Sequence, residues 1–396
     1  MHPQRYPLSK LRRVALEQQG LLRAAPWGRG RSGTAKTIRQ LGYVQIDTIS
    51  VVERAHNHVL GTRVPNFRPH HLDELQRRGE IFEYWYHAAA YLPMEHYRFA
   101  LRRMHQLKNS DKWYRSRDKK LNAKVLHRVS MEGPLRARDF EGNRNSKGWW
   151  DWKPAKLALE QLYLQGDLMI LSRDGFQKKY DLPERVLPSD VVTTPPSDEE
   201  FAQHLIDNTL RSHGFATPRS ITYNRRDNPL RTAVKRLLDE AEASGSLISF
   251  ELPNGERVFA DPELMEQRAP SAPRNVKILS PFDNVVIQRD RAMALFDFDY
   301  QIECYLPEPK RRFGYFSLPL LYQDRLVGRM DCKAHRKDKR FEVKHLSLED
   351  SFTSRGREEQ FRVAFSDSLR TFATFNQCTD VTIKNVTPAS WKRYLS

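Results

Sequence analysis

Two polar side chains stand close together inside an apolar stretch near the N-terminus. In the run LGYVQIDTIS, residues 41–50, a single apolar residue separates Gln45 from Asp47. If residues 43–49 form an extended strand, both side chains share one face and lie about 7 Å apart. Such a pair can hold a water molecule, accept its proton and place negative charge beside a developing cation. Hydrolysis of a C1′–N glycosidic bond through an oxocarbenium-like state requires this chemistry.

The same pair also has an ordinary structural interpretation. Polar residues two positions apart are common on half-buried strands, where they face solvent or cap a neighbouring turn. Residue type and spacing alone therefore leave both interpretations open.

An aromatic cluster follows the motif. The stretch EYWYH, residues 83–87, contains Tyr84, Trp85 and His87. Aromatic rings near basic residues suit stacking on an extruded or unpaired base. A corner of the core with hydrogen-bonded hydroxyl groups would use the same residues. Tyr84 and His87 are nevertheless candidates for part of a lesion site.

Further candidates for contact with DNA combine positive charge with aromatic character. RNSKGWWDWKPAK, residues 144–156, places three tryptophans among cations, although these rings could equally pack between modules. With the cations and histidines that follow the motif, the candidates are Arg54, His56, Arg63, Lys147, Trp149 and Lys153.

The charge of the chain favours a polyanionic partner. Its 396 residues include 66 Lys and Arg against 49 Asp and Glu, a formal net charge of +17. Phosphate neutralisation supplies most non-specific affinity for nucleic acid. No long amphipathic helix with a lysine-rich polar face and no apolar run long enough to cross a bilayer are visible, so a membrane is not expected as partner. We expect a cytoplasmic protein that associates with the nucleoid through DNA.

Neither a metal nor a cofactor is expected. The three cysteines are widely spaced, and His56 and His58 have no third ligand at a metal-binding spacing. Nucleotide-binding glycine loops are absent too.

A weak internal repeat indicates the domain organisation. Residues 158–188 and 233–265 each read as a helix that ends at a glycine, Gly166 or Gly245, followed by a strand, a turn and a second strand. Two short helical segments precede each copy, which is the order of a winged helix-turn-helix module. A pair of unrelated α+β segments would show nearly the same periodicity.

The fold class expected from these patterns is α+β. We predict an N-terminal winged-helix module with the motif strand (1–120), two further winged-helix modules (121–192 and 193–272), and a small β-barrel domain with a C-terminal helix (273–396). Short strands with turns at intervals of roughly ten residues suggest a small β-barrel or sandwich, of which we expect the barrel. One helical face of the last segment carries Phe361, Phe365, Leu369 and Phe372.

Three separated stretches resemble one known family. VQIDTISVVERAHNHVLGTRV, EYWYHAAAYLP and LSPFDNVVIQRDRAMALFDFDYQIECYLPEPKRRFGYFSLPLLYQDRLVGRMD occur in this order, and together they look like the bacterial winged-helix DNA glycosylases of the AlkZ and AlkX (YcaQ) type. The resemblance extends from about Leu8 to beyond residue 340. It implies tandem winged helices, a β-barrel domain and action on alkylated DNA.

The resemblance also assigns roles to the motif. The family's catalytic sequence is glutamine, an apolar residue, then glutamine or aspartate, here Gln45, Ile46 and Asp47. Aspartate in the last position is typical of the AlkX branch, which implies unhooking of interstrand crosslinks and excision of simpler N7-alkylguanines. The partner implied is double-stranded DNA with alkylated bases or crosslinks, and no lysine nucleophile is evident, so hydrolysis without a lyase step is expected.

A non-catalytic winged-helix transcriptional regulator is the alternative. It would form a symmetric dimer with a preferred DNA sequence, whereas a repair enzyme prefers damaged DNA of any sequence. No coiled coil or apolar dimer stripe is visible, which favours a monomer.

Overall fold

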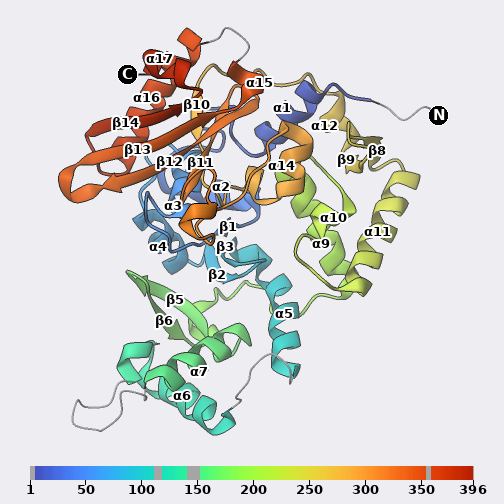
Figure 1. Cartoon of the computed structure of the whole chain (residues 1–396). Coiled ribbons are helices and arrows are strands. Elements are labelled where there is room, and N and C mark those ends of the chain that lie inside the picture. Colours follow the sequence, from blue (N-terminus) through green and yellow to red (C-terminus); the bar gives the residue numbers. More distant parts are fainter. Residues whose placement is uncertain (1–4, 111–117, 141–151, 354–357, 396) are drawn as a thin grey trace. The chain divides into compact units, whose positions relative to one another are not determined.

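The protein has a mixed α+β fold made of helices and small sheets (Figure 1). The computed structural model describes residues 5–110, 118–140, 152–353 and 358–395. The chain divides into two compact units: residues 1–68 and 205–396 form unit 1, and residues 69–204 form unit 2. The boundaries of the four domains predicted from the sequence are not tested by this division and remain a prediction.

Unit 1 begins with two helices that lead into the glutamine–aspartate motif. They are α1 (Leu8–Gln18) and α2 (Gly30–Leu41). Helix α2 ends at Gly42, whose φ of 77° is left-handed, and a Cβ atom at this position would overlap the side chain of Asn208. The chain therefore turns sharply into the short strand β1 (Val44–Gln45) and continues irregularly to α3 (Ala55–Gly61).

The C-terminal part of unit 1 contains an open five-stranded sheet with the order β10-β11-β12-β13-β14. All neighbouring pairs are antiparallel except β13 and β14, which are parallel. The strands are β10 (Val276–Ile278), β11 (Ser317–Tyr322), β12 (Arg325–His335), β13 (Arg340–Leu348) and β14 (Asp380–Thr387).

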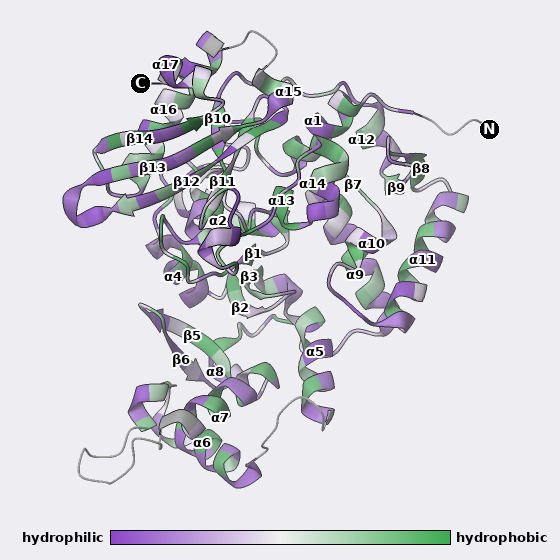
Figure 2. Cartoon of the chain, viewed as in Figure 1, coloured by the Kyte–Doolittle hydropathy of each residue, from purple (hydrophilic) through white to green (hydrophobic). Residues whose placement is uncertain are grey.

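The expected β-barrel is wrong, because β10 and β14 remain at opposite edges of this sheet. Helix α16 (Glu358–Phe375) crosses between β13 and β14 and brings β14 in parallel, and its apolar face covers the sheet instead (Figure 1). The predicted helical face is confirmed, since Phe361, Phe365, Leu369 and Phe372 all lie in the core cluster of the sheet. The turn between β12 and β13 is hydrophilic (Figure 2).

A second apolar core of unit 1 joins its N-terminal helix to later elements. Leu11 and Leu16 of α1 lie in one cluster with Phe215, Phe250 and Phe298. Residues of α12 (Pro262–Glu266), α13 (Asn284–Ile287) and α14 (Arg289–Phe296) also belong to this core.

The repeated helix-and-hairpin unit is present in both segments in which the sequence indicates it. The copy in unit 2 contains α6 (Lys119–Glu132), β4 (Leu135–Arg136), α7 (Trp152–Leu164), β5 (Met169–Asp174) and β6 (Gln177–Asp181), with the strand order β4-β6-β5. The later copy contains α9 (Asp198–His213), β7 (Phe215–Ala216), α10 (Pro218–Ile221), α11 (Asn228–Ala243), β8 (Ile248–Glu251) and β9 (Arg257–Ala260), with the corresponding order β7-β9-β8.

Unit 2 also contains the hairpin that carries the aromatic cluster. Its strands β2 (Ile81–Trp85) and β3 (Ala89–Pro93) pair antiparallel, between α4 (His70–Arg77) and α5 (Tyr97–Asn109). Buried Glu83 accepts two hydrogen bonds from Arg173 of β5, at 2.7 and 2.5 Å. These bonds connect the β2–β3 hairpin to the β5–β6 hairpin. Within the described ranges, no helix is both long and apolar enough to span a membrane.

A buried ion pair connects the beginning and the end of unit 1. Arg63 Nη1 and Nη2 donate to the two carboxylate oxygens of Asp283 at 2.7 and 2.8 Å, and both side chains are fully buried. Arg63 also donates to the carbonyl oxygens of Gln19 and Val59. Asp283 in turn accepts from the N–H of Val285 and caps α13. The five N–H groups of the guanidinium and the two oxygens of the carboxylate all need hydrogen-bond partners once the pair is fully desolvated. Most of these groups have such a partner here.

Replacing Arg63 by methionine leaves the Asp283 carboxylate buried without its counter-charge. We expect Arg63→Met to lower the free energy of unfolding by about 3–5 kcal/mol, measured by urea unfolding. Arg219→Met is the control, because the pair between Arg219 and Asp290 is largely exposed and its loss should cost less than about 1 kcal/mol. Equal losses in the two variants would contradict a special role for the buried pair.

Candidate active site in unit 1

The glutamine–aspartate motif lies at the end of a very short strand. The prediction of a strand over residues 43–49 is correct only for Val44 and Gln45. The N–H of Ile49 donates to Asp47 Oδ1 at 2.7 Å, so the aspartate forms a local turn in place of a strand ladder. Burial also departs from strict alternation, since Gln45 is buried and Asp47 is half-buried.

The segment that carries the motif is fixed from the C-terminal half of unit 1. The hydrogen bonds that fix it run from Asn284 Nδ2 to Tyr43 O (3.4 Å), from Ala334 N to Val51 O (2.9 Å) and from Glu53 N to Asn376 Oδ1 (2.6 Å). Both Asn284 and Asn376 are fully buried. The irregular backbone around Asp47 is therefore held from both sides, as positioning a reactive group requires.

The environment of Asp47 favours a basic carboxylate. Burial raises the pKa of Asp47 above its ordinary value, and the N–H groups of Ile49 and Thr48 oppose the rise only in part. A higher pKa makes the carboxylate a better proton acceptor near neutral pH.

The negative charge of Asp47 also acts on two later residues. Burial is the largest cause of the raised pKa values of the Cys304 thiol and the Tyr305 phenol, and the Asp47 charge raises both further. The loop of residues 303–316 thus lies within electrostatic range of the motif. From the sequence, this loop enters only as part of a stretch that carries the family resemblance, and none of its residues is named there as part of a site. The signal that could have found it is the basic, aromatic run YLPEPKRRFGY, residues 305–315.

The candidates that follow the motif lie mostly inside unit 1. Burial lowers the pKa of His58 to about 4, so the ring is neutral at pH 7, and Nε2 donates to Ile278 O at 2.8 Å. His56 is also buried, and Arg63 is 1% exposed with its guanidinium in the ion pair. Arg54, at the start of α3, remains partly exposed. Of these side chains, only Arg54 is partly exposed, whereas His56, His58 and Arg63 are buried.

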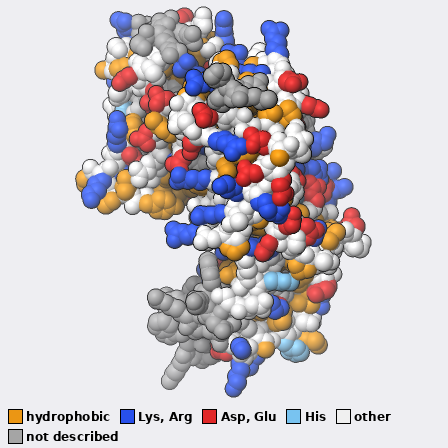
Figure 3. Space-filling view, turned by 90° about the vertical axis from the view of Figure 1, so that its right-hand side faces the viewer, with side chains coloured by type: hydrophobic (Ala, Val, Ile, Leu, Met, Phe, Trp, Pro, Cys, Tyr) orange, Lys and Arg blue, Asp and Glu red, His pale blue; other side chains and the backbone are white. Residues whose placement is uncertain are grey.

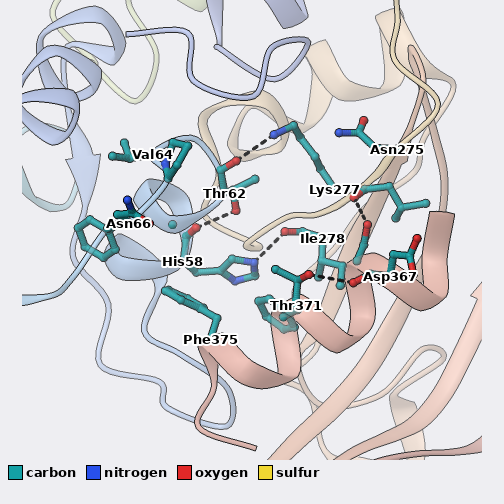
Figure 4. A pocket seen from close by; sticks show the side chains of 16 residues that line it. His58, Thr62, Val64, Asn66, Asn275, Lys277, Ile278, Asp367, Thr371 and Phe375 are labelled. Atoms are coloured by element: carbon teal, nitrogen blue, oxygen red, sulfur yellow. Dashed lines mark hydrogen bonds between the residues drawn. The ribbon is translucent and has the colours of Figure 1, made fainter. Parts of the chain in front are cut away.

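A cavity of about 430 Å³ lies beside the C-terminal end of α3 (Figure 4). His58, Lys277 and Phe375 line it, and Lys277 Nζ donates to Thr62 O at 2.9 Å. Burial lowers the pKa of Lys277 to about 8. Gln45 and Asp47 are not among the residues that line this cavity, so it is separate from the motif.

The aromatic candidates belong to unit 2, where the structure divides them between core and surface. Tyr84 is fully buried and its hydroxyl donates to Leu164 O at 2.6 Å, so it fits the alternative of a packed core corner. Trp85 is 40% exposed, with the Arg103 guanidinium 5.4 Å from its ring centre. His87 is half-buried in the turn that joins β2 to β3.

The remaining candidate residues do not define a site in the described part of the structure. Lys147 and Trp149 lie outside the described residues, and Lys153 belongs to the first turn of α7. Among the residues that are described, no three His, Cys, Asp or Glu side chains gather in a way that could hold a metal ion. On the face in Figure 3, Lys and Arg side chains are interspersed with Asp and Glu side chains.

The sequence of the chain matches a known family, and its fold is similar to a solved structure. Residues 38–375 match the model of the DNA glycosylase AlkZ-like family, so the chain belongs to this family and is a DNA N-glycosylase. Among solved structures, Streptomyces sahachiroi DNA glycosylase AlkZ has a similar fold, with a TM-score of 0.64. The two are 14% identical, and the match covers 97% of this chain and 100% of the other.

The raised pKa of Asp47 has a consequence for stability. The folded state holds the Asp47 proton more tightly than the unfolded state, so ionisation of Asp47 costs stability as the pH rises through its folded pKa. We expect Asp47→Asn, whose amide oxygen can still accept from Ile49, to be more stable than the parent near pH 7.

Unfolding of both proteins followed as a function of pH checks this prediction. The difference should vanish below the unfolded pKa of about 3.9, because Asp47 is then protonated in both states. A variant that is less stable than the parent at pH 7 would contradict the proposed cost of burying the charge.

Proposed function

We propose that the protein hydrolyses the N-glycosidic bond of N7-alkylated purines in double-stranded DNA, with Asp47 and Gln45 as catalytic residues. The observation that carries this proposal is a half-buried carboxylate with a raised pKa, next to a buried amide in a segment held by long-range hydrogen bonds. The membership of the family supplies the reaction class.

The substrate itself explains why a single carboxylate suffices. A purine alkylated at N7 is cationic, so it can leave without protonation by an acid. The enzyme has to stabilise the sugar cation and direct a water molecule at C1′. Asp47 supplies the negative charge and accepts the water proton, and the Gln45 amide both donates to and accepts from that water.

Aspartate in the second polar position of the motif supports the AlkX branch for this chain. In the resemblance described above, aspartate at this position is typical of that branch. On this basis we assign unhooking of interstrand crosslinks to the protein as well. Its reaction is hydrolytic and monofunctional, and it acts as a monomer.

DNA binding is assigned to winged-helix modules. In each helix-and-hairpin unit, the first short strand pairs with the last strand, as in a winged helix. Because the whole chain has a net charge of +17, such modules can bind the DNA backbone whatever the base sequence. Residues 1–120, 121–192 and 193–272 are the proposed modules, and Arg54, Trp85 and His87 remain proposed contacts to DNA.

Excision from defined duplexes tests this function. One duplex carries a single N7-methylguanine and another a nitrogen-mustard interstrand crosslink, and cleavage after hot alkali reports the abasic site. We expect the parent to act on both substrates. Asp47→Asn should slow excision by about 10²- to 10⁴-fold, because it removes the charge and the base while keeping the shape.

Asp190→Asn is the control for this test, since Asp190 lies on an exposed loop of unit 2. Its excision rate should equal that of the parent. Excision by Asp47→Asn at the parental rate would refute the catalytic assignment, and tight binding to undamaged DNA without excision would support the regulator alternative.

A further inference from the structure

An exposed aromatic ring stands at the start of the loop of residues 303–316. Tyr305 is 76% exposed, although it follows the buried Glu303 by only two residues. A single exposed apolar side chain is ordinary on a protein surface, so Tyr305 matters here through its position near the proposed functional site. Here the functional site is the catalytic motif of unit 1.

The loop that carries Tyr305 is fixed from within. The buried Glu303 carboxylate accepts from the N–H groups of Arg312 (3.0 Å), Phe313 (2.7 Å) and Gly314 (3.1 Å). Gly314 has a φ of 114°, and a Cβ atom there would overlap Asp331. The loop is therefore closed on itself by one carboxylate, so little backbone freedom remains to be lost on binding.

Cations follow Tyr305 along the same loop. Lys310 and Arg312 are exposed. Arg311 donates to Leu306 O at 2.9 Å and lies 5.0 Å from the centre of the Tyr315 ring, so its charge is held at a defined place. An exposed flat ring on the same loop as three cations fits a nucleobase next to its phosphates.

The loop and the motif are anchored on the same structure. Ile49, Ile302 and Tyr315 all pack against the apolar core of the five-stranded sheet. Phe316, at the end of the loop, donates its N–H to Asp331 Oδ1 on β12, and β12 also binds the motif segment through Ala334. The electrostatic effect of Asp47 on Cys304 and Tyr305 agrees with this placement.

We propose that Tyr305 stacks on a DNA base beside the reacting nucleotide, while Lys310, Arg311 and Arg312 bind the adjacent phosphates. This inference rests on the proposed function, because it takes the nucleotide at Asp47 as the reacting one. Tyr305 is then a positioning residue: its ring fills the space beside the damaged nucleotide and holds C1′ near Asp47. Stacking uses the face of the ring and needs no hydroxyl group.

Binding to an unreacted lesion tests the stacking. In the Asp47→Asn background, which prevents excision, a duplex carries N7-methylguanine with 2-aminopurine as its neighbour, and both affinity and 2-aminopurine fluorescence are measured. Adding Tyr305→Ala should weaken binding about 10-fold and abolish the fluorescence change. Tyr305→Phe should preserve both. Met293→Ala, which removes an exposed apolar side chain from α14, is the matched control and should change neither.

The outcomes separate this inference from the proposed function. Suppose that the parent excises the lesion, and that Tyr305→Ala in the Asp47→Asn background binds and changes fluorescence like Asp47→Asn alone. This result would overturn the stacking role and leave the glycosylase assignment intact. Loss of the fluorescence change in Tyr305→Phe as well as in Tyr305→Ala would also overturn it, since the hydroxyl would then be required. No excision by the parent, together with loss of binding in Tyr305→Ala alone, would support the contact and refute the proposed function.

Discussion

The buried ion pair between Arg63 and Asp283 is the interaction on which the candidate active site depends. It joins residues 220 positions apart. Arg63 lies just beyond the end of α3, the helix that follows the segment carrying Gln45 and Asp47. The next residue, Asn284, holds Tyr43 O at the start of that segment. One desolvated pair thus fixes both where the motif begins and where the following helix packs. Removing either partner would leave the other charge unpaired in the core, which is a far larger penalty than the loss of a surface pair.

The chemistry of the site follows from where this arrangement leaves Asp47. A carboxylate in water has a pKa too low for an effective base near pH 7, and partial burial raises it. The same burial makes the charged form costly to the folded state, so ionisation of this carboxylate acts against stability. The hydrogen bonds to Tyr43, Val51 and Glu53 from distant parts of the chain hold the segment in place despite that cost.

Local features of the sequence were predictable, and long-range features were not. The spacing of Gln45 and Asp47, the repeated helix-and-hairpin unit and the apolar face of α16 are all encoded within a few residues. The strand over residues 43–49 failed because the Asp47 side chain competes for the N–H of Ile49. Arg63 looked like a DNA contact because its partner, Asp283, is remote in sequence. The expected barrel failed because a helix covers the sheet and brings in the last strand in parallel, which strand periodicity cannot reveal.

The pH dependence of single-turnover excision tests the central claim most directly. Rates for a duplex with N7-methylguanine, corrected for spontaneous depurination, are measured for the parent and for Asp47→Asn over the range in which both stay folded. If Asp47 is the base, the parental rate falls on the acid side with an apparent pKa above the ordinary value of about 3.9, and the slow residual rate of the variant lacks this limb. The same acid limb in both proteins would contradict the account, since another group would then control the reaction.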